Sequence, residues 1–456
     1  MSSLFGTMWI AVGGMLAEQG ALDAASNNVA NVNTPGFSRQ RPVLIEGDPI
    51  SLGPLTLGSG VVLQKLESLR DPILELRIQE ETQQQGQLDA LVSGMSQVQV
   101  MFTTSSSDIG TQISNFFASL NQLSTDPANV SLRQGVLTAA GNLANTFRTA
   151  THNLAVQQAN LDVNVTRVVQ QVNLLTGQIA GLNGQIKGME DRHENASAFV
   201  DQRDVLIGQL SSLVDVSSVE SDSGLTLTTS NGTALVAGNR SFPLDTQIDV
   251  SGVQHIFAQG TDITGKLTAG KLAGLLQMRD QKIPGVLSNL DALAAGFANA
   301  VNTAHRSGFD LNGAAGGDLF VPPPAGGQGA AASMAVQITD PALIAASSDG
   351  SPDSNGNLAV LSAVHDQAVA SGQTATDFYA NLVFGVGSDV SNASAEEDAS
   401  QLILRQLQDQ RGSISGVSLD EEAANMIRYQ RAYEAAARMV STVNDILDTT
   451  INLGRY

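Results

Sequence analysis

Apolar residues recur at alternating intervals of four and three positions at both ends of the chain. Near the N-terminus the repeating positions are Leu4, Met8, Ala11, Met15, Leu22, Ala25, Val29 and Val32. Near the C-terminus they are Leu419, Ala423, Met426, Tyr433, Ala437, Val440, Leu447, Ile451 and Gly454. This spacing is typical of coiled-coil helices, which bury such a stripe against a partner helix. We therefore expect each end to form a long helix and the two helices to pack against each other.

The N-terminal segment carries more apolar residues than one partner helix can cover. Its additional apolar positions are Phe5, Trp9, Ile10, Val12 and Leu16. A helix that is apolar on all sides is buried on all sides, so we expect this segment to complete its packing against other copies of the chain or related subunits. A signal peptide or membrane span is disfavoured, because no Lys or Arg precedes Arg39 and the apolar stretch is too short to cross a bilayer.

A third apolar series runs through the middle of the chain in a single helical phase. It consists of Leu137, Ala140, Ala144, Phe147, Leu154, Leu161, Val165, Val168, Val172, Leu175, Ile179, Leu182, Ile186 and Met189. The pattern predicts a coiled-coil or bundle helix roughly 80 Å long. Asp71-Pro72 and Asp126-Pro127 each have the sequence of a helix start, an N-cap followed by proline at the first helical position.

The segments before the middle series and directly after it differ in character. Pro35-Gly36 suits a type II turn, and residues 38–66 alternate proline, glycine and β-forming residues, which indicates an extended arm or small hairpins. A shorter helix is expected from Ser197 to Val214. Residues 216–271 then read as β-strands, with a hairpin signal at Asn231-Gly232.

Helix is expected again over residues 272–306, with a bend at Pro284. The Gly-, Ala- and Pro-rich tract at 310–333 indicates a mobile surface loop, and shorter helices are expected within 358–410. Ser418 to Glu421 form a capping box that opens the last helix.

The expected fold is mainly α with a β insert, built from terminal coiled-coil helices, a long-helix bundle core and an inserted small β domain. The expected units are an N-terminal coiled-coil helix at 1–38, an extended arm at 39–70, a long-helix core domain at 71–215, a β-rich insert at 216–271, a helix returning to the core at 272–306, a loop-rich outer region at 307–357, core helices at 358–410 and a C-terminal coiled-coil helix at 411–456.

The amino-acid composition of the chain excludes several classes of partner and site. The 456 residues carry a net charge of −21, which argues against binding a nucleic-acid backbone because that requires a basic face. The chain contains no cysteine, which excludes disulfides and thiolate metal sites. This fits a reducing cytoplasm or a protein that crosses an envelope unfolded. No stretch reads as transmembrane.

The sequence predicts no catalytic, cofactor or metal site. The five histidines include no pair at the spacing of a helical zinc site. Gly260 to Lys266 match a phosphate-binding loop, but Leu267 stands where a hydroxyl should hold magnesium, so a β-turn is favoured. Asp201 to Asp204 place opposite charges close together and are interpreted as a solvated ion pair. We therefore expect a protein that is not an enzyme.

Two terminal motifs resemble those of bacterial flagellar axial proteins, the rod, hook and junction subunits. The N-terminal motif includes Asn28, Ala30, Asn31, Thr34, Pro35, Gly36 and Phe37. The C-terminal motif runs from Leu419 to Tyr433. Ser38-Arg39-Gln40 and five inner segments further resemble the hook-associated protein 1 family, the first junction proteins between hook and filament. These segments are Asp126 to Ala128 before the long helix, Asp201 to Asp204, Leu276 to Asp280, Gly308 to Gly313 and Gly317 to Phe320.

The resemblance implies a structural subunit that is exported unfolded by the flagellar type III system. Its implied partners are other copies of itself in a ring or helical array, the flagellar hook protein, the second junction protein (hook-associated protein 3) and an export chaperone at the C-terminal region. It implies an extracellular place in the flagellum after a cytoplasmic stage. A hook or distal-rod subunit, whose middle would consist mainly of strands, and a generic coiled-coil binding module remain as alternatives.

Overall fold

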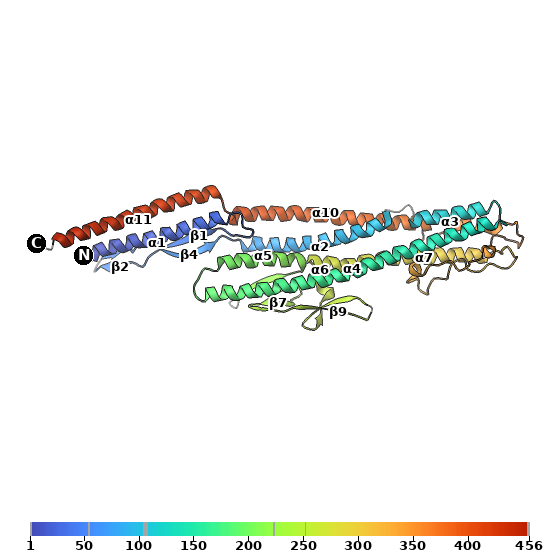
Figure 1. Cartoon of the computed structure of the whole chain (residues 1–456), viewed down its shortest axis with the longest axis horizontal. Helices are drawn as coiled ribbons and strands as arrows, with labels where there is room; N and C mark the ends of the chain where they lie inside the picture. Colours follow the sequence, from blue (N-terminus) through green and yellow to red (C-terminus); the bar gives the residue numbers. More distant parts are fainter. Residues whose placement is uncertain (1, 53–54, 104–107, 222–223, 251, 454–456) are drawn as a thin grey trace.

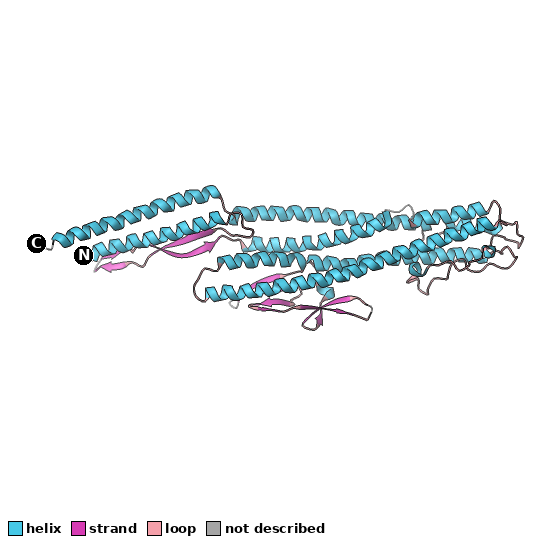
Figure 2. Ribbon diagram, in the orientation of Figure 1, coloured by secondary structure: helices cyan, strands magenta, loops and turns pink. Residues whose placement is uncertain are grey.

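The computed structural model describes residues 2–52, 55–103, 108–221, 224–250 and 252–453. Two sections lie end to end along one elongated molecule (Figure 1). One, which we call the terminal section, contains both ends of the chain; the other is a bundle of long helices with small sheets on one side (Figure 2). The predicted class, mainly α with a β insert, is confirmed.

The terminal section is built on the predicted pair of end helices. Helices α1 (Ser2–Ala30) and α11 (Leu419–Leu453) pack against each other and run in opposite directions, with both chain ends at the same tip (Figure 1). Ser418 Oγ accepts a hydrogen bond from the Glu421 N–H, as the capping box predicts. Gly454, the last position of the predicted C-terminal stripe, lies outside the described residues.

A β-ribbon covers a second side of α1. Strands β1 (Gln40–Glu46) and β4 (Val61–Ser68) pair antiparallel, from Gln40 opposite Ser68 to Glu46 opposite Val61. Between them β2 (Ile50–Leu52) and β3 (Leu55–Leu57) form a second antiparallel pair. The segment predicted as an extended arm or small hairpins therefore folds back along α1, which it contacts through β1 and β4.

The longest helix of the bundle is α4, which runs unbroken over Val130–Glu190. Its 61 residues make it about 92 Å long. The start predicted at Asp126-Pro127 is wrong by a few residues. Asn129 is the N-cap, since its side-chain oxygen accepts from the N–H groups of Ser131 and Leu132, while Asp126 lies in the preceding turn.

The other bundle helices pack around α4 or against each other. They are α2 (Pro72–Thr103), α3 (Ile109–Leu123), α5 (Ser197–Leu213), α6 (Gly270–Gln277), α7 (Ile283–Arg306), the short α8 (Ala330–Ser333), α9 (Gly356–Ala363) and α10 (Ala375–Ser415). The shorter helices expected over 358–410 are therefore incorrect in part: α9 is short, but a single helix of 41 residues, α10, follows it and packs along α2.

Two further expectations change in detail. Near Pro284, where a bend is expected, the helix has a π-helical turn over Met278–Lys282, which ends two residues before the proline. Proline lacks the N–H that would continue an α-helical ladder, so a locally wider turn at this point is physically reasonable. The tract at 310–333 is a loop but not wholly a surface one, because Leu319, Phe320 and Ala331 are fully buried.

The predicted β insert forms two small sheets beside α4. The first has β5 (Ser217–Ser221), β6 (Gly224–Thr228), β7 (Ala234–Ala237) and β8 (Arg240–Ser241), and the second has β9 (Leu244–Ile248), β10 (Gln254–Ala258) and β11 (Thr261–Asp262). Gln259 and Gly260, with φ of 49° and 80°, make the tight turn between β10 and β11. The segment that matches a phosphate-binding loop thus begins in a β-turn, as the sequence favours, but continues through β11 into a 3-10 helix over Thr264–Lys266.

The bundle has one continuous hydrophobic core, and the terminal section lies outside it. At one end, four rings pack with centroids 5.4–6.0 Å apart, those of Phe116, Phe117, Phe297 and Phe320. The core cluster extends from Ala90 to Ala393 and includes no described residue of α1 or α11. The two sections are therefore joined by contacts other than a shared apolar core.

Below about pH 6.5 the bundle should lose stability through His305. This ring is fully buried, donates from Nδ1 to the Gly317 carbonyl at 2.7 Å and accepts the Ala345 N–H at Nε2, 2.9 Å away. Burial lowers the pKa of His305, more strongly than the Gly317 bond and the nearby Asp318 raise it. Below its ordinary pKa, the His305 ring is protonated in the unfolded chain but stays neutral in the folded chain. The free energy of unfolding therefore has its full value above the pKa of the unfolded state. It decreases as the pH falls towards the lower pKa of the folded state.

The test compares melting temperatures of the wild type and His305→Gln from about pH 7 to about pH 5. Glutamine keeps a donor and an acceptor but does not titrate. The wild type should lose more of its melting temperature over this range than the variant. Parallel curves for the two proteins would contradict this role of His305.

Candidate assembly interface

The inner face of α1 consists mostly of small residues. The buried apolar residues of this helix are Ala11, Ala17, Ala21, Ala24 and Ala25. Of the positions predicted to form the assembly seam, Ala11 is buried and the others are only half-buried: Leu4, Met8, Met15, Leu22, Val29 and, just after the helix, Val32. Helix α11 therefore does not fully cover the predicted seam in a single subunit.

Helix α11 is covered even less. The predicted seam residues Met426, Tyr433, Ala437, Val440 and Leu447 are half-buried, whereas Ile451 is exposed. Its most buried apolar residue is Val443, which the spacing did not single out. The true contact face is thus turned slightly from the predicted one, and much of this helix remains open for further contacts.

The residues beyond the seam on α1 form an open apolar stripe. Phe5, Trp9 and Leu16 are 50%, 71% and 60% exposed, and Val12 lies half-buried on the same face. We call these four residues the α1 stripe. Further along this side of the helix the residues become polar, beginning with Gln19 and Asp23. The apolar surface that a neighbour could bury is therefore confined to the N-terminal half of α1.

The N-terminal motif forms a polar joint, which we call the elbow (residues 31–40), where α1 ends and β1 begins. Asn28, 1% exposed, fixes this joint with its side chain. Its Oδ1 accepts the Gln40 N–H at 2.9 Å, and its Nδ2 donates to the Gln40 carbonyl and to Glu422 of α11. Arg39 donates to Glu421 and Glu422, each at 2.7 Å. The elbow thereby ties the two ends of the chain together.

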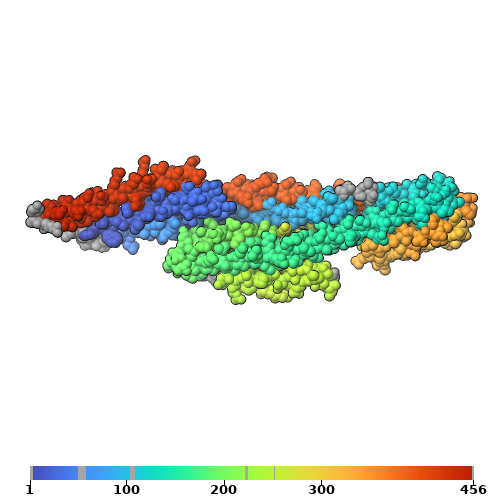
Figure 3. Space-filling view, in the orientation of Figure 1, coloured from blue at the N-terminus to red at the C-terminus, as the bar shows by residue number. Residues whose placement is uncertain are grey.

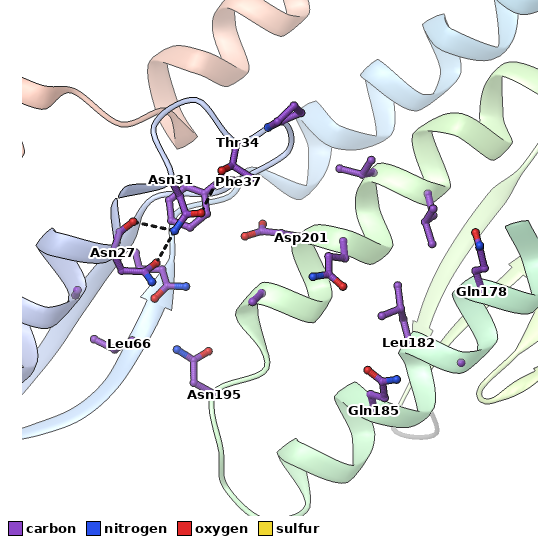
Figure 4. Close-up of a pocket in the computed structure, with 18 of the residues that line it drawn as sticks. Asn27, Asn31, Thr34, Phe37, Leu66, Gln178, Leu182, Gln185, Asn195 and Asp201 are labelled. Carbon is purple, nitrogen blue, oxygen red and sulfur yellow. Dashed lines mark hydrogen bonds between the residues drawn. The ribbon is translucent and has the colours of Figure 1, made fainter. Parts of the chain in front are cut away.

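The rest of the motif shapes the turn of the elbow. Asn31 donates to the Asn27 carbonyl at 3.0 Å, and Thr34 donates to the Asn31 side chain at 3.1 Å (Figure 4). Gly36 follows Pro35 with a φ of +80°, as a type II turn requires. Phe37 lies half-buried after the turn, while Ala30, the last residue of α1, is exposed. The turn at Pro35-Gly36 is thus as the sequence predicts, whereas Asn31 and Thr34 were singled out by the resemblance alone.

A second set of polar contacts joins the terminal section to the bundle. Arg70, between β4 and α2, donates to Asp201 at 2.6 Å and to Asp204 at 3.0 Å on α5. The Ser38 N–H also donates to Asp201. The interpretation of Asp201 to Asp204 as a solvated ion pair is therefore wrong: Asp201 and Arg203 are buried, and burial raises the pKa of Asp204 despite the nearby Arg70.

A groove of about 940 Å³ lies beside the elbow, between the end of α1, α4 and α5. Figure 4 shows Gln178, Leu182 and Gln185 of α4 on one side and Asn27 and Asn31 on the other. Its lining is mostly amide and apolar.

The described residues contain no cluster of His, Asp and Glu that could hold a metal ion. Among the described helices, none combines the length and apolar character needed to cross a bilayer.

Gly36→Ala should loosen the elbow. A Cβ at this position would lie 2.2 Å from Val205 Cγ2 of α5, and the positive φ costs a non-glycine residue roughly 1–2 kcal/mol. We expect faster hydrogen exchange at the backbone amides of residues 31–40, with little change in the bundle. Adding Val205→Ala removes the clashing methyl group and should recover part of the protection. Equal loss in the single and double variants would contradict the steric explanation.

Three family models of flagellar proteins match parts of this chain. Family models match residues 95–320 (flagellar hook-associated protein FlgK helical domain), 8–37 (flagella basal body rod protein) and 410–453 (flagellar basal body rod FlgEFG protein C-terminal). The two terminal matches coincide with α1 and most of the elbow, and with α11.

Whole-chain relatives agree with these matches. Flagellar hook-associated protein 1 of Bacillus subtilis (strain 168) is 30% identical over 502 residues, covering 99% of each chain. The Escherichia coli (strain K12) protein of the same name is 28% identical over 549 residues, covering 99% of this chain and all of the relative. The solved structure of the flagellar hook junction protein FlgK from Burkholderia pseudomallei shares the fold, with a TM-score of 0.66 at 18% identity, over 74% of this chain and all of its own.

Proposed function

The chain belongs to the family of flagellar hook-associated protein 1, and from this membership we infer that it is a structural subunit at the junction between hook and filament of the bacterial flagellum. The family is one of structural flagellar proteins, so we assign the chain a mechanical role without catalysis. The observation that best supports this role is the open terminal section. Its polar elbow holds the two end helices together, while the α1 stripe remains uncovered.

Self-assembly is the function that this arrangement supports best. Burying exposed apolar surface stabilises association by roughly 25 cal/mol per Å², and the α1 stripe offers two aromatic side chains, Phe5 and Trp9, at its N-terminal end. The predicted seam positions on α11, which are at most half-buried, would also gain cover from neighbours. We propose that copies of the chain meet through their terminal sections and present the bundles outwards, in contact with the hook protein below and the second junction protein above.

The described middle of the chain disfavours the alternative of a hook or distal-rod subunit. That alternative calls for a middle consisting mainly of strands, whereas residues 130–190 form one helix and the sheets are short. The third alternative, a generic coiled-coil binding module, leaves the elbow motif and the family membership unexplained.

Export through the flagellar type III system is part of the proposal. A chain without cysteine can pass unfolded through a narrow channel without forming disulfides on the way. Because α11 lies outside the bundle core, it could remain unfolded and bound to a chaperone in the cytoplasm without exposing that core. The mature location proposed is extracellular, on the flagellum.

Deletion of the gene tests this function directly. Cells lacking the chain should build hooks of normal length but release filament subunits into the medium instead of polymerising them. A plasmid copy of the gene should restore filaments. Normal filaments in the deletion strain, or absent hooks, would contradict a junction role.

A further inference from the structure

Arg203 of α5 is a buried arginine without a close acid inside the subunit. It is 6% exposed, and its Nε has no hydrogen-bond partner among the described residues. The nearest carboxylate oxygens are those of Asp204, 3.5 Å from Nε, and of Glu220, 3.8 Å from Nη2. Both distances exceed the usual length of an N–H···O hydrogen bond. The charge of Arg203 is therefore poorly compensated within one subunit.

The two other arginines that are almost fully buried in the described chain both have close acceptors. Arg133 donates to the Ile344 carbonyl at 2.7 Å, and Arg279 donates to Asp162 at 2.8 Å. A buried charge without such acceptors is costly, because it has lost its hydration and gained little in exchange. Arg203 differs from both, which points to an acceptor from outside the subunit.

Arg203 lies in the wall of a pocket of about 360 Å³ between the start of α2, α5 and β5. Arg70 lines the same pocket, and its Nε is also buried without a hydrogen-bond partner among the described residues. Burial raises the pKa of Asp204 in this wall, and this effect outweighs the attraction of Arg70 and Arg203. Water therefore solvates the pocket poorly, and its arginines attract an acceptor more strongly than they would on the open surface.

The mouth of the pocket carries exposed apolar side chains. Leu76 lines the pocket and is 45% exposed, and Ile73, one turn earlier on α2, is 72% exposed. An arginine beside apolar side chains is typical of the centre of a protein–protein contact. Glu220 also lines the pocket, but its side chain is 75% exposed, so its carboxylate remains largely in water. These features favour a protein surface over a free small molecule as the source of the acceptor.

Resting on the proposed function, we propose that Arg203 binds the carboxylate of an Asp or Glu side chain that a neighbouring flagellar subunit inserts into this pocket. The planar guanidinium can donate two parallel hydrogen bonds to one carboxylate. The pocket also lies close to the terminal section, through which we expect subunits to meet. Arg70, which lines it, joins the bundle to that section, and Figure 3 shows the green end of the bundle beside the blue terminal section.

Removal of the charge tests the proposal in the purified subunit. Arg203→Met should not lower the melting temperature, because the charge that it removes has no close partner there. Arg279→Met is the matched control. It removes a similarly buried arginine whose acceptors are present, and it should lower the melting temperature by many degrees. A comparable drop for Arg203→Met would show that Arg203 is satisfied within the subunit and would overturn the proposal.

Sodium acetate probes the carboxylate chemistry, because acetate has the functional group of an Asp side chain. At equal ionic strength, replacing chloride by acetate should raise the melting temperature of the wild type more than that of Arg203→Met. Comparing the two proteins cancels the general effect of the salt on protein stability. Equal shifts in both proteins would overturn the binding of a carboxylate by Arg203.

Photo-cross-linking identifies the neighbour while Arg203 stays in place. A photoreactive amino acid replaces Glu220 at the mouth of the pocket, and purified hook–filament structures are irradiated. The chain should become joined to an adjacent subunit, at a peptide in which mass spectrometry finds an Asp or Glu beside the linked residue. Adding Arg203→Met should lower the yield. The control places the same photoreactive group at Val250, in the exposed turn between β9 and β10, and should give no such product.

The outcomes separate the pocket from the proposed function. Incorporated chains that give no cross-link from position 220, or a cross-link to a peptide without acidic residues, would overturn the contact with a neighbouring carboxylate, even where acetate binds through Arg203. Filaments that grow normally without any incorporated chain would instead contradict the junction function itself.

Discussion

Replacing Trp9 with aspartate should abolish incorporation at the hook tip and leave the bundle unchanged. In a single subunit this position is 71% exposed, so a carboxylate there stays in water. Once a neighbour covers the α1 stripe, the same carboxylate must lose its water or bind a proton, at a cost of several kcal/mol. Since each 1.4 kcal/mol is about tenfold in affinity, the loss for each contact is about a hundredfold or more.

Three measurements decide this prediction: the amount of variant in purified hook–filament structures, the amount secreted, and the melting temperature of the purified protein. Secretion must be measured because a defect in export would also prevent assembly. Gln19→Asp is the matched control. It adds the same charge to the exposed polar half of the same helix and should assemble normally. A Trp9→Asp protein that assembles, or whose bundle melts many degrees lower, would be inconsistent with the account.

Replacing Arg39 with methionine should separate α11 from α1 at the elbow. Glu422 is 2% exposed, and Arg39 is its cationic partner at 2.7 Å. Removing one partner of a buried ion pair costs about 3–5 kcal/mol, because the remaining charge is left uncompensated. Asn28 still donates to Glu422, so we expect the lower end of this range. Limited proteolysis should then cut near residues 411–422 much faster than in the wild type.

The neighbouring Arg41 provides the control. It pairs with Glu67 at 2.9 Å, but its side chain is 61% exposed, and water and salt screen such exposed pairs so that they contribute little to stability. Arg41→Met removes the same charge and should leave the cleavage rate nearly unchanged. The melting of the bundle should stay constant in both variants, because its core includes no described residue of α1 or α11. Similar proteolysis of the two variants would show that burial of Glu422 is not what holds the elbow.

The sequence predicts helices well where apolar residues are dense. In α4 the buried residues, such as Phe147, Leu161 and Ile179, follow the predicted phase over most of the helix. In α10 the buried positions from Val386 to Leu407 fall on every seventh residue, and they include Ala393 and Ser400. One inward residue for each two turns, sometimes small or polar, gives too weak a periodicity to identify one long helix.

The elbow shows what a sequence alone does not reveal. Asn28, which fixes the elbow, also bonds to Glu422 of α11; these two residues are 394 positions apart, and neither is apolar. Periodicity reports which faces of a helix are buried, but not which polar side chains meet across the fold. By contrast, the surplus of apolar residues around Trp9 is visible in the sequence, because no single partner helix can cover every side of α1.

If neighbouring copies complete the terminal section, assembly should protect a single cysteine placed on the α1 stripe. Leu16 is 60% exposed in the single subunit, so Leu16→Cys is the probe, and Val250→Cys, in the exposed turn between β9 and β10, serves as the reference. In the purified subunit a maleimide should label both. In hook–filament structures, we expect Leu16→Cys to be protected while Val250→Cys still reacts. Equal labelling of both positions after assembly would contradict it.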